Sequence, residues 1–160
     1  MKPRFENTND HDGNMKHLVF SMEKAIAITK KHPAKQEKVS LIIDNAEFSL
    51  FNAPPMNTSC EFLSILQNQY PERLFKAYIM HPPFYFTVFW NLIYPFIDPV
   101  TKEKIFFLSL DEEEMKRQLE QDIDLSQVET GCGGTDPRPF DSALYLRAPF
   151  DCDFSVALRG

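Results

Sequence analysis

One long uncharged segment limits what this chain can fold into. No Asp, Glu, Lys or Arg occurs in the nineteen residues Ile79–Ile97, and seven of the thirteen residues in Phe84–Phe96 (FYFTVFWNLIYPF) are aromatic. A helix that crosses a bilayer takes about 20 apolar residues. Three prolines inside the segment leave only Phe84–Tyr94 as an uninterrupted helix, because proline ends or kinks helices. That length is too short for a transmembrane span.

The same segment nevertheless needs apolar surroundings. A helix that is apolar on every side is either fully buried or faces something other than water. In a small domain a sheet covers one side of such a helix, so the other side must meet a second protein wall or lipid. The residues alone leave a core helix and a lipid-facing helix equally open.

Composition narrows the class of protein. A chain of 160 residues with 43% hydrophobic and 25% charged residues is typical of one globular domain. The net charge of −6 argues against nucleic-acid binding and against bulk attraction to anionic membranes. Three widely spaced cysteines favour a reducing compartment over a disulfide framework or a zinc site. The N-terminal sequence contains no apolar signal segment, so the sequence predicts a cytoplasmic protein.

Short apolar runs alternate with helical patterns along the chain. Val39–Ile43, Phe75–Met80 and Lys104–Leu108 are bounded by turn residues and predict buried parallel strands. Predicted helices separate and flank them, at Met15–Thr29, Met56–Gln69, Phe84–Tyr94 and Ser109–Asp122. This order predicts an α/β fold with a mostly parallel sheet, flanked by helices and joined by right-handed crossovers.

Local signals mark the ends of two of these helices. Asn14 is the predicted N-cap of the first, and Pro33 is its predicted stop. Ser109–Glu112 matches a capping box at the start of the last helix. The acidic run Asp111–Glu114 is therefore interpreted as a favourable helix N-terminus and not as a metal site.

Motifs of known catalytic or metal sites do not occur. The sequence contains no GxSxG, Walker or HExxH pattern. Gly131–Gly134 is interpreted as a turn, and the DHD triplet at Asp10–Asp12 as a solvated loop with too few ligands for a metal. No serine or cysteine has the sequence context of a nucleophile, which a hydrolase on an α/β sheet would need. The sequence predicts a binding protein that is not an enzyme and has no metal or cofactor.

A resemblance to a known family indicates which ligand the chain binds. The matching motifs are YPER at 70–73, HPP at 81–83, the aromatic helix, DPVTKEKI at 98–105 and the Gly133-Gly134 pair. They resemble the CRAL-TRIO lipid-binding domain found in secretory-pathway phosphatidylinositol transfer proteins. The resemblance implies a pocket for one lipid, closed by a movable gate helix at Phe84–Tyr94. The gate and apolar pocket residues that it implies are Phe84, Phe86, Phe89, Trp90, Ile93 and Phe96.

The resemblance also implies headgroup ligands. In family members that carry phosphatidylinositol, the matching positions contact the inositol phosphate, and here they are Glu72, Thr101 and Lys104. Lysine pairs with phosphate, and a carboxylate accepts hydrogen bonds from inositol hydroxyls. Without the family, a structural ion pair between Glu72 and Lys104 is the simpler interpretation.

Some positions depart from the family pattern. Val39 and Leu41 stand where members that carry phosphatidylcholine have hydroxyl side chains, which argues against that lipid here. His81 replaces a strand-end asparagine, and Cys132 replaces an aromatic residue. MKPRFENT resembles the end of the family's first strand, so residues 1–160 are expected to be one CRAL-TRIO domain without the N-terminal helical region.

These inferences combine into one functional prediction. The chain is expected to bind a phospholipid, with phosphatidylinositol favoured, and to transfer or present it at cytosolic membranes as a monomer. Its expected partners are the phospholipid and a transient membrane surface, with no nucleic acid, and its expected location is cytoplasmic and peripherally membrane-associated. The alternative is a protein-interaction or regulatory module with a vestigial lipid pocket, which would contain no lipid.

Overall fold

Three parallel strands form the centre of the fold. The computed structural model describes residues 10–31, 37–51 and 53–150. Strands β1 (Val39–Asp44), β2 (Leu74–Met80) and β3 (Ile105–Phe107) lie side by side in that order, and both pairs are parallel. The α/β fold with a parallel sheet is therefore confirmed. Pro33, Cys152 and the MKPRFENT segment lie outside the described residues.

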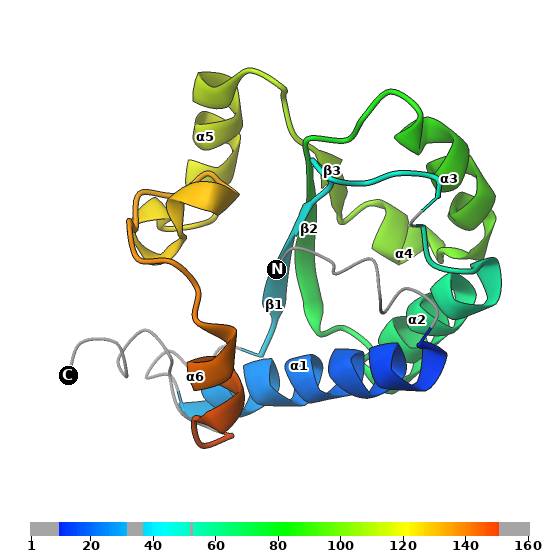
Figure 1. Cartoon of the computed structure of the whole chain (residues 1–160), viewed down its shortest axis with the longest axis horizontal. Coiled ribbons are helices and arrows are strands. Elements are labelled where there is room, and N and C mark those ends of the chain that lie inside the picture. The colour runs from blue at the N-terminus through cyan, green and yellow to red at the C-terminus, as the bar shows by residue number, and fades with distance from the viewer. Residues whose placement is uncertain (1–9, 32–36, 52, 151–160) are drawn as a thin grey trace.

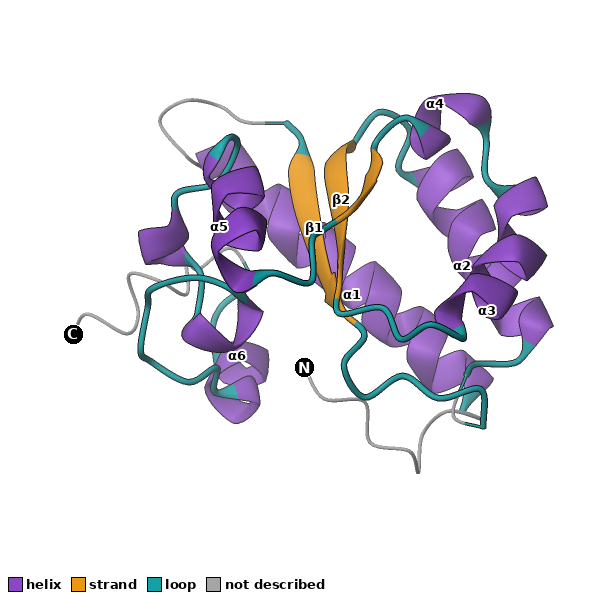
Figure 2. Cartoon of the chain, turned by 90° about the horizontal axis from the view of Figure 1, so that it is seen from above, coloured by secondary structure: helices purple, strands orange, loops and turns teal. Residues whose placement is uncertain are grey.

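Helices cover the sheet on both sides. They are α1 (His11–Lys31), α2 (Met56–Gln69), α3 (Phe86–Ile93), α4 (Pro99–Lys102), α5 (Glu112–Glu120) and α6 (Ser142–Arg147), with 3₁₀ turns η2 (Tyr94–Phe96), η3 (Leu125–Gln127) and η4 (Thr130–Cys132). Figure 1 shows α2, α3 and α4 on one side of the strands, α5 on the other, and α1 crossing below. Figure 2 shows the same division from above, with α6 on the side of α5.

Two groups of buried side chains hold these layers together. One joins the end of β2 to α5 and η3, and consists of Tyr78, Met80, Leu108, Met115, Leu119 and Leu125. The other joins α1 to the beginning of β1 and to the turn before β2, and consists of Leu18, Met22, Ile26, Val39 and Tyr70. Each buried aliphatic side chain contributes roughly 1.5–3 kcal/mol, so both layers are firmly attached to the strands.

Two helices begin elsewhere than predicted. α1 starts at His11, a turn before the expected cap, because the Asp10 carboxylate accepts a hydrogen bond from the Gly13 N–H at 2.9 Å. The N-cap of α5 is Asp111, whose carboxylate accepts from the Glu114 N–H at 2.9 Å. Aspartate is a strong N-cap residue, and the acidic run does lie at a helix N-terminus, as predicted.

The first and third strands are less buried than predicted, since Phe106 and Phe107 of β3 are exposed. Val39 is buried, but Ile43 and Asp44 are exposed. β1 and β3 are the two edge strands of the described sheet, so fewer neighbours cover them than cover β2. The apolar run correctly predicted a parallel strand, but burial depends on the position of that strand in the sheet.

The aromatic segment forms a short helix. It folds into α3, which has eight residues, and continues into η2. None of the helices formed by the described residues combines the length and the hydropathy that crossing a bilayer requires.

Candidate functional site

A pocket of about 370 Å³ lies between α2, β1, the turn before β2, and α4. Side chains from several elements form its apolar wall, namely Val39, Leu41, Leu63, Leu66, Leu74 and Val100. Polar side chains line the rest, including Gln67 from α2 and Asp98 before α4. The pocket therefore joins an apolar surface to a group of polar and charged residues.

The three predicted headgroup residues line this one pocket. Glu72 comes from the turn between α2 and β2, Thr101 from α4, and Lys104 from the turn before β3. The sheet brings them together, because the Lys104 carbonyl accepts the Ala77 N–H at 2.8 Å and so aligns the start of β3 with β2. Their contact with a headgroup stays a prediction.

Glu72 and Lys104 make no charged contact with other described residues. Within the described ranges, neither side chain takes part in an ion pair or a side-chain hydrogen bond. The structural ion pair between them, which was the simpler interpretation, is not formed in this structure. Both groups can therefore interact with a ligand that enters the pocket.

The backbone at Glu72 is strained. Its φ of 61° lies in the left-handed region, which costs a non-glycine residue of order 1–3 kcal/mol. The preceding Tyr70 fixes this turn against α1, because its hydroxyl donates to the Glu23 carboxylate at 2.8 Å. Burial and that hydrogen bond raise the pKa of Tyr70 to about 12. Strain that is held in place at a pocket is typical of functional positions.

A short capped helix positions Thr101. The Asp98 carboxylate accepts the Thr101 N–H at 3.0 Å and caps α4, and Pro99 occupies the first helical position. Hydrogen bonds from Thr101 lower the pKa of Asp98. The Asp-Pro pair is a recognisable helix start, but a four-residue helix is too short for a periodicity signal, so neither α4 nor the capping role of Asp98 was predicted.

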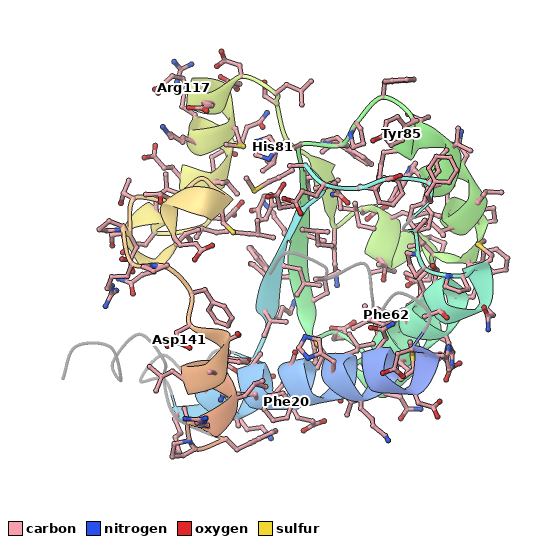
Figure 3. The ribbon with its side chains drawn as sticks, in the orientation of Figure 1. Phe20, Phe62, His81, Tyr85, Arg117 and Asp141 are labelled. Carbon is pink, nitrogen blue, oxygen red and sulfur yellow. The ribbon has the colours of Figure 1, made fainter. Side chains whose placement is uncertain are left out.

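The inner side of α3 packs against aromatic side chains of the loop after β1 and of β3. Phe86 is buried, and its ring centroid lies 5.1 Å from that of Phe48. The Trp90 ring lies 5.1 Å from the Phe107 ring. The Tyr85 hydroxyl, at the upper right in Figure 3, donates to the Phe48 carbonyl at 2.7 Å. These contacts hold α3 in its present position.

The outer side of α3 is also apolar. Phe84 is 90% exposed, and Val88, Leu92 and Phe96 are each more than half exposed. Val88 and Leu92 lie four residues apart and so share one side of α3, whereas Phe84 lies in the turn before α3 and Phe96 in η2 after it. Of the six residues predicted for the gate and apolar pocket, Phe86 is buried, Phe84 and Phe96 are exposed, and Phe89, Trp90 and Ile93 are half-buried. None of the six lines the 370 Å³ pocket.

His81 has a structural partner at the end of β2. Its Nδ1 lies 3.0 Å from a carboxylate oxygen of Asp44, which ends β1, and Figure 3 shows His81 at the upper end of the strands.

Burial and the neighbouring Glu129 carboxylate raise the pKa of the Cys132 thiol. A raised pKa makes a thiol less reactive, which gives no support to a hydrolase.

A second pocket lies on the other side of β1. It has a volume of about 650 Å³ and lies between α1, β1 and residues 127–146. It is larger than the first pocket, but it contains none of the predicted site residues. Its Arg138 guanidinium is already bonded to the Asp136 carboxylate, with Nε 2.8 Å from Oδ1. The smaller pocket combines an apolar wall with charges that have no partner among the residues that the structure describes, and this favours it as the candidate site.

Sequence comparison identifies the family. Residues 1–134 match the CRAL/TRIO domain. The chain belongs to the CRAL/TRIO domain family. A CRAL-TRIO domain-containing protein of Schizosaccharomyces pombe is 35% identical over 133 residues, which are 83% of this chain and 12% of that protein. The phosphatidylinositol transfer protein PDR17 of Saccharomyces cerevisiae is 31% identical over 112 residues, which are 67% of this chain and 31% of PDR17.

A solved structure supports the CRAL-TRIO fold. The crystal structure of Sfh5 superposes with a TM-score of 0.61 at 23% identity, over 84% of this chain and 44% of Sfh5. At this identity the similarity concerns the fold. The chain spans less than half the length of each of these three proteins.

Proposed function

We propose that this CRAL-TRIO domain binds one phospholipid, with phosphatidylinositol favoured, and transfers or presents it at cytosolic membranes without catalysing a reaction. The observation that carries the proposal is the pocket shared by Glu72, Thr101 and Lys104, in which neither charge has a partner among the described residues. The similarity to PDR17, which is named a phosphatidylinositol transfer protein, supports the same ligand.

The chemistry of the pocket suits an inositol phosphate. The Lys104 ammonium would pair with the phosphate, and the Glu72 carboxylate would accept hydrogen bonds from ring hydroxyls. A volume of about 370 Å³ is at the small end of ligand sites, so it suits the headgroup and the glycerol. The acyl chains need further space, which outward movement of α3 would provide.

In the proposed mechanism, movement of α3 allows the protein to exchange its lipid at a membrane. At a bilayer, the exposed apolar side of α3 meets lipid while its inner side leaves the Phe48 and Phe107 rings. One lipid exchanges, and closure then removes the acyl chains from water. The protein would be a cytoplasmic monomer, peripherally membrane-associated, with a phospholipid as its ligand and no affinity for nucleic acid. The alternative, an interaction module with a vestigial pocket, predicts that no lipid is bound.

Lipid analysis and two substitutions test the proposal. Mass spectrometry of the purified protein is expected to find phosphatidylinositol. Lys104→Ala removes a charge-assisted phosphate contact worth roughly 1.5–3 kcal/mol, so phosphatidylinositol transfer between vesicles should fall by about ten-fold or more. Glu72→Ala should also reduce transfer.

Lys102→Ala is the matched control for these variants. Lys102 lies in α4, two residues from Lys104, but it lies over the Tyr94 ring at 4.2 Å and does not line the pocket. Transfer should stay close to that of the wild type in this variant. Unchanged phosphatidylinositol transfer in both Lys104→Ala and Glu72→Ala would overturn the headgroup assignment.

A further inference from the structure

The Gln67 side chain connects α2 to the segment between the gate helix and α4. Its carboxamide oxygen accepts the Asp98 N–H at 2.7 Å, and its carboxamide nitrogen donates to the Phe96 carbonyl at 3.3 Å. One side chain thus bonds to the backbone on both sides of Ile97. A neighbouring parallel strand would make the same pair of bonds to a residue in this position.

Ile97, the residue between the two atoms that Gln67 binds, connects α3 and η2 to α4. Ile97 has extended backbone, with φ of −87° and ψ of 130°, and is 3% exposed. On its N-terminal side, η2 continues directly from α3. On its C-terminal side, Asp98 caps α4, which carries Thr101 and leads to Lys104. Figure 1 shows α2, α3 and α4 together on one side of the sheet.

The chemistry of the side chain fits this place. A carboxamide has a donor and an acceptor at fixed separation, whereas a carboxylate keeps the acceptor alone and a leucine has neither. Gln67 also lines the pocket next to Asp98 and Thr101. A movement of α3 about Ile97 therefore changes the two hydrogen bonds of Gln67, and with them the support of the α4 cap.

We propose that Gln67 is a positioning residue that couples the gate helix to the headgroup pocket. With both bonds made, α3 is closed and α4 holds Thr101 and Lys104 in place for the inositol phosphate. When α3 swings outward, the bond to the Phe96 carbonyl is lost and the support of α4 weakens, so the headgroup is released as the gate opens. This coupling rests on the proposed function and adds a residue and a mechanism to it.

Two variants and one control test the coupling. Gln67→Leu removes both hydrogen bonds, and Gln67→Glu has nearly the same shape but loses the donor. Gln69→Leu is the control, because Gln69 is an exposed residue of the same helix that does not line the pocket. Each protein is incubated with vesicles that contain phosphatidylinositol, and the bound lipid is measured by mass spectrometry after the vesicles are removed. Release is then followed into phosphatidylcholine vesicles.

The fluorescence of Trp90, the single tryptophan of the chain, can be used to follow the position of the gate helix α3. Trp90 lies on α3, against the Phe107 ring, so its emission should differ between lipid-free and loaded wild-type protein. In Gln67→Leu this difference should be largely lost. Phosphatidylinositol should leave at least about five-fold faster, because the loss of even one of the two hydrogen bonds would change the rate by about that factor. Gln67→Glu should be intermediate, and Gln69→Leu should behave as the wild type.

The results of these experiments distinguish a failure of the proposed Gln67 coupling from a failure of the proposed lipid-binding function. If the Gln67 variants melt at lower temperature but keep the wild-type release rate and the Trp90 response, Gln67 is a structural residue and the coupling is wrong. If wild-type protein takes up no phosphatidylinositol from vesicles, the proposed function itself fails. Normal uptake by the wild type, with faster release and no Trp90 response in Gln67→Leu, supports both.

Discussion

At the scale of the residue, one carboxylate links the sheet to the segment after α5. Oδ2 of Asp122 lies 2.6 Å from the Lys76 Nζ and 2.7 Å from the Tyr78 hydroxyl, both on β2. The hydrogen bond from Lys76 and then that from Tyr78 lower the pKa of Asp122 below its ordinary value of 3.8. The folded state therefore favours the ionised carboxylate.

The contribution of Asp122 to the free energy of unfolding depends on pH. Because the pKa of Asp122 is lower in the folded state, its contribution to stability is present above pH 4 or so and is lost as the pH falls through the folded pKa. Asp122→Asn should reduce the free energy of unfolding by about 1 kcal/mol at pH 7, a value that allows for solvent screening. Urea unfolding at pH 7 and at pH 3 should show that the difference from the wild type narrows in acid.

Glu120→Gln is the control for this prediction. Glu120 is the exposed last residue of α5, and its substitution should change stability by less than about 0.5 kcal/mol at either pH. A difference between Asp122→Asn and the wild type that stays constant from pH 7 to pH 3 would show that the carboxylate charge is not what stabilises this link.

At the scale of the element, α3 has two apolar sides that differ in exposure, and we expect them to differ in role. Phe86 is buried on the inner side, whereas Val88 is 54% exposed on the outer side. Val88→Asp should leave the fold intact and reduce lipid transfer between vesicles, because a charge on this side opposes contact with the bilayer. Transfer assays and circular dichroism on the same preparation test both parts.

Two substitutions on the same helix complete this test. Thr87→Asp places the same charge on an exposed polar position and should change transfer much less. Phe86→Asp buries a carboxylate, which costs several kcal/mol and should unfold the domain. If Thr87→Asp reduces transfer as much as Val88→Asp does, the apolar stripe has no special role at the membrane.

At the scale of the whole molecule, charge and apolar surface act in opposite directions. The net charge of −6 is repelled by anionic lipids, so under the proposed function we expect membrane contact to come from the apolar side of α3. Co-sedimentation should therefore show weaker binding to vesicles with phosphatidylserine than to vesicles of phosphatidylcholine alone. Added salt should reduce this difference, because it screens the repulsion. Binding that strengthens with phosphatidylserine and weakens with salt would point to a basic surface instead.

The sequence by itself determined the three strands and the order of the four longest helices around them, but not the short helices α4 and α6. Apolar runs bounded by turn residues predicted all three strands, and the limits of α2 matched the structure, because short-range patterns decide local structure. The resemblance to the CRAL-TRIO domain, and not the residue pattern alone, named Glu72, Thr101 and Lys104, and these residues do line one pocket.

Tertiary structure alone decided which residues meet. Gln67 lies about thirty positions before Asp98, and no local pattern indicates that its carboxamide bonds to the backbone around Ile97. The exposure of β1 and the two different sides of α3 likewise depend on which elements pack against them. Such contacts join segments far apart in the chain, and they form only when the sheet sets the distances between its helices.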